Sequence, residues 1–241
     1  MTNSKKLIKM TVLAMLIALG VIISPLLRVE GMCPMAHFIN IVCSVFLGPW
    51  YSLLCALLIG IIRMTMMGIP PIALTGAIFG AFLSGVFYRM SKGNLLFAVL
   101  GEIIGTGFIG AVLSYPVMSI LWGREGLSWL FYIPSFVCGT LIGGSIAFAF
   151  LKKLSASGSL QKFQSMLSSP VYADSPSLAG NAVSIATIGV ICFVVINIAK
   201  PLFGFTSPLW NYASYFLLVL FIFVALIYLL TGSLRGKYKN D

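Results

Sequence analysis

The chain is 241 residues long, 60% hydrophobic and only 8% charged, and its formal net charge at pH 7 is +10. Apolar runs of about 17–25 residues, the length that crosses a bilayer, recur along it without the alternation typical of barrel strands. This excludes a water-soluble globular protein and predicts an all-α integral membrane protein. The basic residues flank the apolar runs, so they indicate membrane topology and not a nucleic-acid-binding surface.

The first predicted helix covers residues 7–24 and ends before Pro25. Basic residues precede it, as in a signal peptide, but no suitable cleavage site follows, so we expect the helix to be retained. Ala14 and Ala18 lie four residues apart on it and therefore share one face. Such a pair permits close approach of another helix, either within this chain or in a partner, and the spacing alone leaves both alternatives open.

The second and third predicted helices lie within residues 34–62 and are separated by Gly48-Pro49. Two helices here give eight spans in all. With a cytoplasmic N-terminus, this topology places 11 of the 15 Lys and Arg residues inside, against 6 of 15 for one kinked helix. The positive-inside rule therefore favours two helices and cytoplasmic N- and C-termini. Four basic residues then lie outside: Arg28, Arg63, Arg124 and Lys200.

Polar side chains open the second helix at its outer end. His37, Asn40 and Ser44 occur at helical spacing and form one polar stripe on an otherwise apolar helix. The stripe is either a hydrated helix end, with Asn40 bonded to a neighbouring helix, or part of a ligand site. Both interpretations remain open.

The fourth and fifth predicted helices cover residues 71–88 and 95–113, and the fifth carries the only acidic residue inside a span, Glu102. A charge at the bilayer centre costs about 2.5–3.5 kcal/mol on insertion scales, so it usually faces a cavity or a partner. Thr106 lies one turn further on the same face. We predict that both residues contact a ligand; the alternative is a protonated Glu102 bonded to a neighbouring helix.

Four further residues lie near the outer side by topology: Arg63, Tyr115, Trp129 and Tyr132. We include the first three in the candidate ligand site, although Trp129 also fits the aromatic belt of a membrane interface. The stretch at 105–110 matches G-x-G-x-x-G, but no strand precedes it, so it does not predict a dinucleotide site. Its glycines instead predict close helix packing, as do the other glycine pairs four residues apart: Gly76 and Gly80, Gly101 and Gly105, and Gly139 and Gly143.

The sixth predicted helix covers residues 129–151, and two more spans follow at 178–199 and 209–230. The Ser-rich stretch before those last two spans is predicted to be a cytoplasmic linker. The predicted organisation is a six-helix membrane domain at 1–154, a linker at 155–177 and a two-helix membrane extension at 178–241.

Catalytic and metal motifs are missing from the sequence. Five scattered cysteines and a single histidine lack metal-ligand spacing, so we predict no metal site and no cofactor. There is no HExxH, no GxSxG and no Walker A sequence, so neither catalysis nor ATP-driven transport by this chain alone is expected. A binding subunit that awaits partners fits best. A small lipid-modifying enzyme, with His37 as its lone base, and an autonomous carrier are the alternatives.

Short motifs then occur in order between residues 7 and 153: LAMLIALG at 13–20, PMAHFIN at 34–40, LGPWY at 47–51, IR at 62–63, GAIFGA at 76–81, GEIIGTG at 101–107 and YPV at 115–117. In these motifs the chain closely resembles the ThiW family of substrate-binding (S) components of energy-coupling factor (ECF) transporters. The resemblance implies a six-helix bundle that captures a vitamin or precursor from outside. It also implies docking on a transmembrane coupling subunit driven by two ATP-binding subunits.

ThiW proteins are assigned to hydroxyethylthiazole, the thiazole precursor of thiamine, so the resemblance implies that ligand; another vitamin is the alternative. The family's docking motif corresponds to Ala14 and Ala18 in this chain. Donors and acceptors for the ligand would come from four polar residues: His37, Asn40, Glu102 and Tyr115. The two C-terminal spans depart from the family pattern. They are either a packing or dimerisation appendage or an element that docks a partner.

Overall fold

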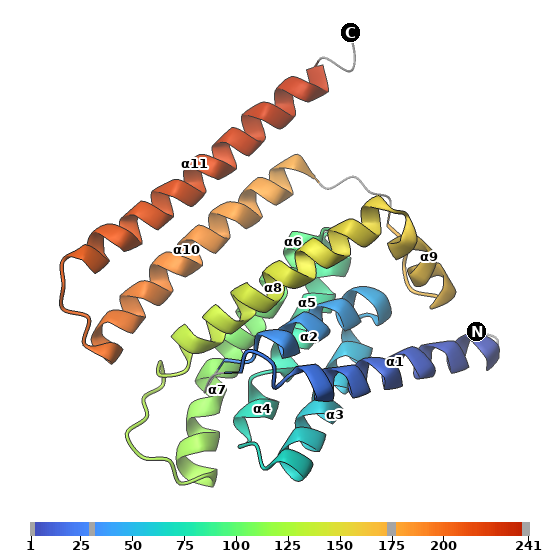
Figure 1. Cartoon of the computed structure of the whole chain (residues 1–241). Helices are drawn as coiled ribbons and strands as arrows, with labels where there is room; N and C mark the ends of the chain where they lie inside the picture. The colour runs from blue at the N-terminus through green and yellow to red at the C-terminus, as the bar shows by residue number, and fades with distance from the viewer. Residues whose placement is uncertain (1–2, 29–31, 173–176, 238–241) are drawn as a thin grey trace. The chain divides into compact units, whose positions relative to one another are not determined.

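The structure is a computed structural model that describes residues 3–28, 32–172 and 177–237 (Figure 1). Its regular structure within these residues is helical, with no sheet, as the composition predicts. The chain divides into two compact units, Met1–Asp174 and Ser175–Asp241.

The first unit begins with three helices, α1 (Asn3–Ile23), α2 (Pro34–Leu47) and α3 (Pro49–Met67). The predicted break between the second and third helices is confirmed. Gly48 adopts a φ of +93°, which favours glycine, and Pro49 then begins α3, where its missing N–H costs no helical hydrogen bond.

The fourth predicted span consists of two helices, α4 (Ile72–Thr75) and α5 (Ile78–Met90). The fifth is longer than predicted and continues from Leu95 to Leu121. It is built from α6 (Leu95–Glu102), the π-helix η1 (Ile103–Gly110), α7 (Ala111–Pro116) and the π-helix η2 (Val117–Leu121). Glu102 lies where the α-helical turns change to π-helical ones, a local irregularity that often accompanies functional sites.

The sixth predicted helix is α8 (Ile133–Ala156), which begins four residues later than expected, with Pro134 in its first turn. Beyond it, the structure differs from the predicted linker, because α9 (Ser159–Met166) forms within that stretch. The side chain of Gln164 is buried and donates hydrogen bonds to the Val45 carbonyl oxygen at 3.1 Å and the Tyr88 hydroxyl at 2.9 Å. These bonds fix α9 against the bundle.

Helix α2 is the centre of the first unit. It contacts α1, α3, α5, α6, α8 and α9, and eleven of its 14 residues are buried, so its polar side chains lie inside the bundle. Glycines allow the neighbouring helices to approach closely. A Cβ on Gly105 would lie 2.6 Å from the Gly80 Cα, and one on Gly143 would lie 3.0 Å from the His37 Cβ. The predicted glycine packing faces are therefore confirmed.

The second unit is a hairpin of two long helices, α10 (Leu178–Phe203) and α11 (Leu209–Lys237), which confirms the last two predicted spans. Ser177 caps the start of α10 by accepting the Gly180 N–H. Between the helices, Asn181 donates to the Tyr228 hydroxyl at 2.9 Å, and Lys200 near the turn donates to the Asn211 side chain at 2.7 Å.

Seven helical segments within the described residues are long and apolar enough to cross a membrane. Eight spans are predicted, and the one missing from these seven is the second in chain order, α2, which is apolar but only 14 residues long. The chain is therefore a multi-pass membrane protein. The eight-span topology and the cytoplasmic placement of both termini stay predictions.

Candidate ligand-binding site

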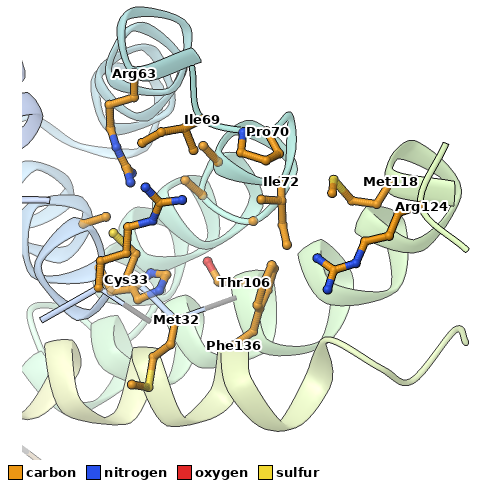
Figure 2. A pocket seen from close by; sticks show the side chains of 16 residues that line it. Met32, Cys33, Arg63, Ile69, Pro70, Ile72, Thr106, Met118, Arg124 and Phe136 are labelled. Carbon is orange, nitrogen blue, oxygen red and sulfur yellow. The ribbon is translucent and has the colours of Figure 1, made fainter. Parts of the chain in front are cut away.

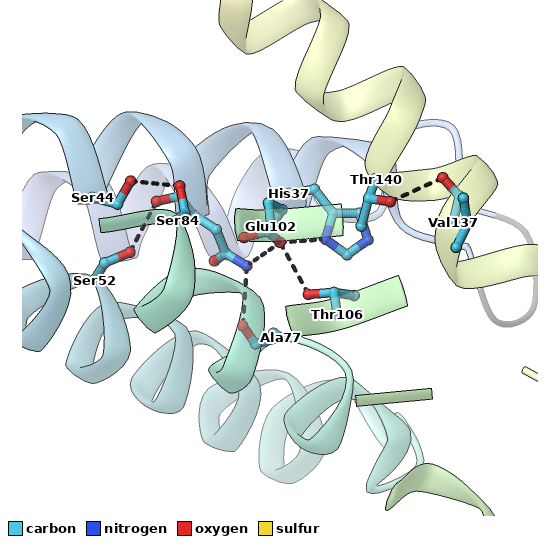
Figure 3. A network of polar contacts seen from close by, with 10 residues as sticks. His37, Ser44, Ser52, Ala77, Ser84, Glu102, Thr106, Val137 and Thr140 are labelled. Carbon is cyan, nitrogen blue, oxygen red and sulfur yellow. Dashed lines mark hydrogen bonds and ion pairs between the residues drawn. The ribbon is translucent and has the colours of Figure 1, made fainter. Parts of the chain in front are cut away.

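Four of the candidate residues meet inside the first unit, around one carboxylate oxygen (Figure 3). Glu102 Oε1 lies 2.9 Å from His37 Nδ1, 3.0 Å from Asn40 Nδ2 and 3.1 Å from Thr106 Oγ1. His37 and Asn40 come from consecutive turns of α2, and Thr106 lies one turn beyond Glu102. The side chains from α2 and those from the α6–η1 run face one another, so the network joins these two segments.

The network settles one alternative for Asn40, because its side chain does bond to neighbouring helices. Besides Glu102, Asn40 Nδ2 donates to the Ala77 carbonyl oxygen at 3.3 Å. Ser44, the third member of the polar stripe, bonds to Ser84 on α5 at 2.8 Å. The inner part of the stripe therefore joins neighbouring helices of the bundle, and His37 at its outer end lines the pocket described below.

Glu102 is fully buried, and its Oε1 accepts hydrogen bonds from Asn40 and Thr106 and shares a third with His37 Nδ1. Glu102 Oε2 has no hydrogen-bond partner among the described residues. The space beside it is limited, because a Cβ on Gly80 would lie 2.8 Å from that atom.

A pocket lies beside this network, at the end of the bundle where α1 and α3 end and α2 and α8 begin (Figure 2). Its cavity volume is about 80 Å³, measured as the space open to the centre of a water-sized sphere. Its polar lining includes His37, Arg63 and Thr106, and its apolar walls include Ile72 and Phe136. This combination of apolar walls and a few polar groups is typical of small-molecule sites.

The structure brings together some of the sequence-predicted site residues and leaves two apart. His37, Arg63 and Thr106 line the pocket, whereas Asn40 and Glu102 lie behind it and are bonded to lining residues or to each other. Tyr115 and Trp129 contact each other, with ring centroids 4.5 Å apart, and are not among the residues that line this pocket.

Two arginines in the lining are not among the sequence-predicted site residues. Arg28 follows α1, and Arg124 follows η2. The predicted topology places both on the outer side, and this position is the sequence signal that points to them, since the positive-inside rule disfavours cations there. The apolar wall residues carried no comparable signal in the sequence.

The small-residue pair on α1 faces outward. Ala14 and Ala18 are exposed, whereas Leu13 and Leu16 are buried on the opposite side of the helix. The two alanines line a shallow apolar hollow with Ile17, Val21, Ile22 and Ile62. Among the described residues, these two alanines therefore do not pack against another helix of the first unit.

No cluster of three or more His, Cys, Asp or Glu side chains that could hold a metal ion occurs among the residues the structure describes. Within that part of the chain the five cysteines form no disulfide. The site is thus built from hydrogen-bonding groups, cationic side chains and apolar walls.

The sequence matches a family described as thiamine-precursor transporter protein (ThiW) over residues 10–157. No curated protein and no solved structure matches the chain. The matched stretch contains all the residues of the Glu102 network and of the pocket lining. It ends before α9 and the second unit.

Proposed function

The chain belongs to the ThiW family of thiamine-precursor transporters, and from that membership we propose that it is the substrate-capturing S component of an ECF importer for hydroxyethylthiazole. The family is one of transporters and not of enzymes. In the proposed cycle, this chain binds the thiazole from outside. It then docks on a transmembrane coupling subunit that two ATP-binding subunits drive.

The observation that carries this proposal is the position of the pocket relative to the charges of the first unit. Eight Lys and Arg residues flank the helices at the opposite end: Lys5, Lys6, Lys9, Arg89, Lys92, Lys152, Lys153 and Lys162. Since basic residues favour the cytoplasmic side, their placement supports a pocket that opens outward. A capture subunit needs its site on that side.

The chemistry of the pocket supports a small heteroaromatic ligand. Phe136 and Ile72 offer apolar contact to a thiazole ring, while His37 and Thr106 offer hydrogen-bonding groups for its nitrogen and its hydroxyl. Asn40 and Glu102 act from behind, because they fix the orientation of His37 and Thr106. Tyr115 and Trp129 remain candidates only for contacts at the outer rim.

The outward face of α1 supports a docking role. Ala14 and Ala18 together form a surface without bulky side chains, where a helix of the coupling subunit can approach closely. The exposure of the pair favours a partner over internal packing.

The experiment that tests this function compares binding with uptake. Purified protein in detergent should bind hydroxyethylthiazole, and proteoliposomes should accumulate it only when the coupling subunit, both ATP-binding subunits and ATP are present. Accumulation by this chain alone would instead establish an autonomous carrier. Binding of a different vitamin, with none of the thiazole, would keep the S-component assignment and overturn the substrate.

The binding arm needs a variant pair. His37→Ala removes a polar group from the pocket wall and should weaken thiazole binding at least 10-fold, a factor that corresponds to about 1.4 kcal/mol. Ser145→Ala changes an exposed hydroxyl of α8 that bonds only to its own helix at Leu141, so binding should stay unchanged. Equal binding by both variants would contradict the placement of the ligand beside His37.

A further inference from the structure

We infer that the pocket holds an anionic group of its ligand, a phosphate or a carboxylate, on the guanidinium of Arg63, with Arg28 and Arg124 supplying further positive charge. The inference rests on the proposed function for the identity of the ring. It differs from that function in the charge of the molecule, because hydroxyethylthiazole itself is neutral.

Arg63 is the principal observation. Arg63 is only 4% exposed, and its Nε is buried without a hydrogen-bond partner among the described residues. A guanidinium stays charged in proteins, and a buried charge is costly unless it is paired. Figure 2 shows the Arg63 side chain directed from the end of α3 into the pocket. An anion in the pocket would supply the missing partner.

Two further guanidinium groups line the same pocket. Arg28 and Arg124 come from separate loops, and in Figure 2 Arg63 and Arg124 enter from opposite sides, with the Thr106 hydroxyl between them. The described lining contains no acidic side chain. Glu102 lies behind the lining, and its Oε1 is already hydrogen-bonded to three side chains of the network. Glu30 lies outside the described residues.

The distribution of charge over the first unit also points to an anion site in this pocket. Its Lys and Arg residues number eleven, and the three at the pocket end, Arg28, Arg63 and Arg124, all line the pocket. The positive-inside rule disfavours cations on this side of a membrane protein. Their convergence on one cavity is explained if they bind an anion there, because a planar guanidinium fork matches both carboxylate and phosphate oxygens.

The ligand class follows from the two halves of the pocket. Apolar walls at Ile72, Met118 and Phe136 suit a small ring, and the arginines suit an anion attached to it by a short chain. Within the thiamine precursors, this describes the phosphate monoester of the thiazole alcohol or a carboxylate of the same ring. A monoester phosphate carries about −1.5 to −2 charges at pH 7, so it would gain most from three arginines.

The test is isothermal titration calorimetry on the full-length protein in detergent. The ligands vary charge and ring separately: hydroxyethylthiazole, its phosphate, the matching thiazole acetic acid, the pyrimidine precursor of thiamine and the phosphate of that pyrimidine. We expect the thiazole phosphate or the thiazole acid to bind at least 10-fold more tightly than the neutral alcohol. The comparison of phosphate with acid identifies the anion.

Variants test whether a preference for the anionic ligand arises from the arginines of the pocket. Arg63→Gln should weaken binding of the anionic ligand by roughly 10- to 100-fold, the usual range for a charge-assisted hydrogen bond, and should weaken binding of the neutral alcohol by a much smaller factor. Arg124→Gln, which alters a less buried residue, should act in the same direction and gives a second, independent variant. Lys153→Gln removes an exposed cation at the opposite end and should change neither ligand.

Each outcome decides between the two claims. Equal or tighter binding of the neutral alcohol, unaffected by Arg63→Gln, would overturn the anion inference and leave the thiazole function intact. Binding of the pyrimidine phosphate alone would uphold the anion site and overturn the thiazole assignment. Failure of all five ligands with folded protein would overturn both.

Discussion

At the scale of single residues, Glu102 determines how the site is organised. Its Oε1 is hydrogen-bonded to side chains from two different segments, and one of these, His37, also lines the pocket. The carboxyl group therefore has two effects. It satisfies buried polar groups inside an apolar bundle, and it fixes the His37 ring at the pocket wall.

We predict a large difference between two substitutions of this residue. Glu102→Ala leaves the side chains of His37, Asn40 and Thr106 without their shared acceptor and should lower the free energy of unfolding by about 3–5 kcal/mol, as for other broken buried pairs. Glu102→Gln keeps the shape and one acceptor oxygen, so the loss should be smaller. Thermal unfolding in detergent measures both, and equal melting temperatures for the two variants would contradict this role.

The sequence identifies some residues of the site better than others, for physical reasons. Polar side chains within apolar spans are costly to bury, so His37, Asn40, Glu102 and Thr106 could be selected without a structure. Their mutual contacts could not, because these depend on how α2 packs against the α6–η1 run. Polar residues in loops pay no such burial cost, so the place of Arg28 in the pocket lining becomes evident only in the folded structure.

At the level of helices, the length of each apolar run predicts a membrane span, and the positions of Gly and Pro predict where helices end. The break at Gly48 was predictable because a positive φ and a following proline interrupt a helix. Helix α9 was not predicted, since eight residues rich in Ser and Gln resemble a linker in composition. What makes it a packed element is tertiary: its buried Gln164 bonds to α2 and α5.

A substitution in α9 tests whether this helix stabilises the bundle. Gln164→Ala removes the donors to the Val45 carbonyl and the Tyr88 hydroxyl, and should lower the unfolding free energy by roughly 1–3 kcal/mol. Lys162→Ala alters an exposed side chain on the same helix and serves as the matched control. The measurement is again thermal unfolding in detergent. If the two variants melt together, α9 contributes nothing to the first unit.

A second prediction at this scale concerns the outward face of α1. Replacing both Ala14 and Ala18 with Trp fills the shallow hollow and should abolish ATP-driven uptake, because a partner helix can no longer approach closely. Ligand binding should be retained, since the pocket lining includes no residue of this helix. Met15→Trp, on an exposed neighbouring position, is the control. Uptake that survives in the double variant would refute the docking assignment.

For the molecule as a whole, the family match and the site lie in the first unit, and the second unit is an addition to them. The match ends at residue 157, and the second unit begins at Ser175. Its helices are apolar, and their internal polar contacts, such as Asn181 to Tyr228, hold the hairpin together. No described residue of this hairpin belongs to the network or to the pocket lining.

Truncation tests this division of labour. A protein that ends at residue 174 should remain folded and bind the ligand with an affinity within about threefold of the full chain, a difference of roughly 0.65 kcal/mol. Binding by calorimetry and monodispersity by size-exclusion chromatography measure the two properties. Loss of uptake with retained binding would assign the hairpin to partner docking. Loss of binding in a folded truncated protein would contradict the separation of the units.

Calorimetric titration of the purified, folded protein is the measurement that decides whether this chain captures the thiazole precursor of thiamine. Hydroxyethylthiazole and its phosphate would be compared with thiamine and the pyrimidine precursor. We expect at least one of the two thiazole ligands to bind saturably, and neither control to displace it at equal concentration. If neither thiazole ligand binds to folded protein, the chain does not capture this precursor.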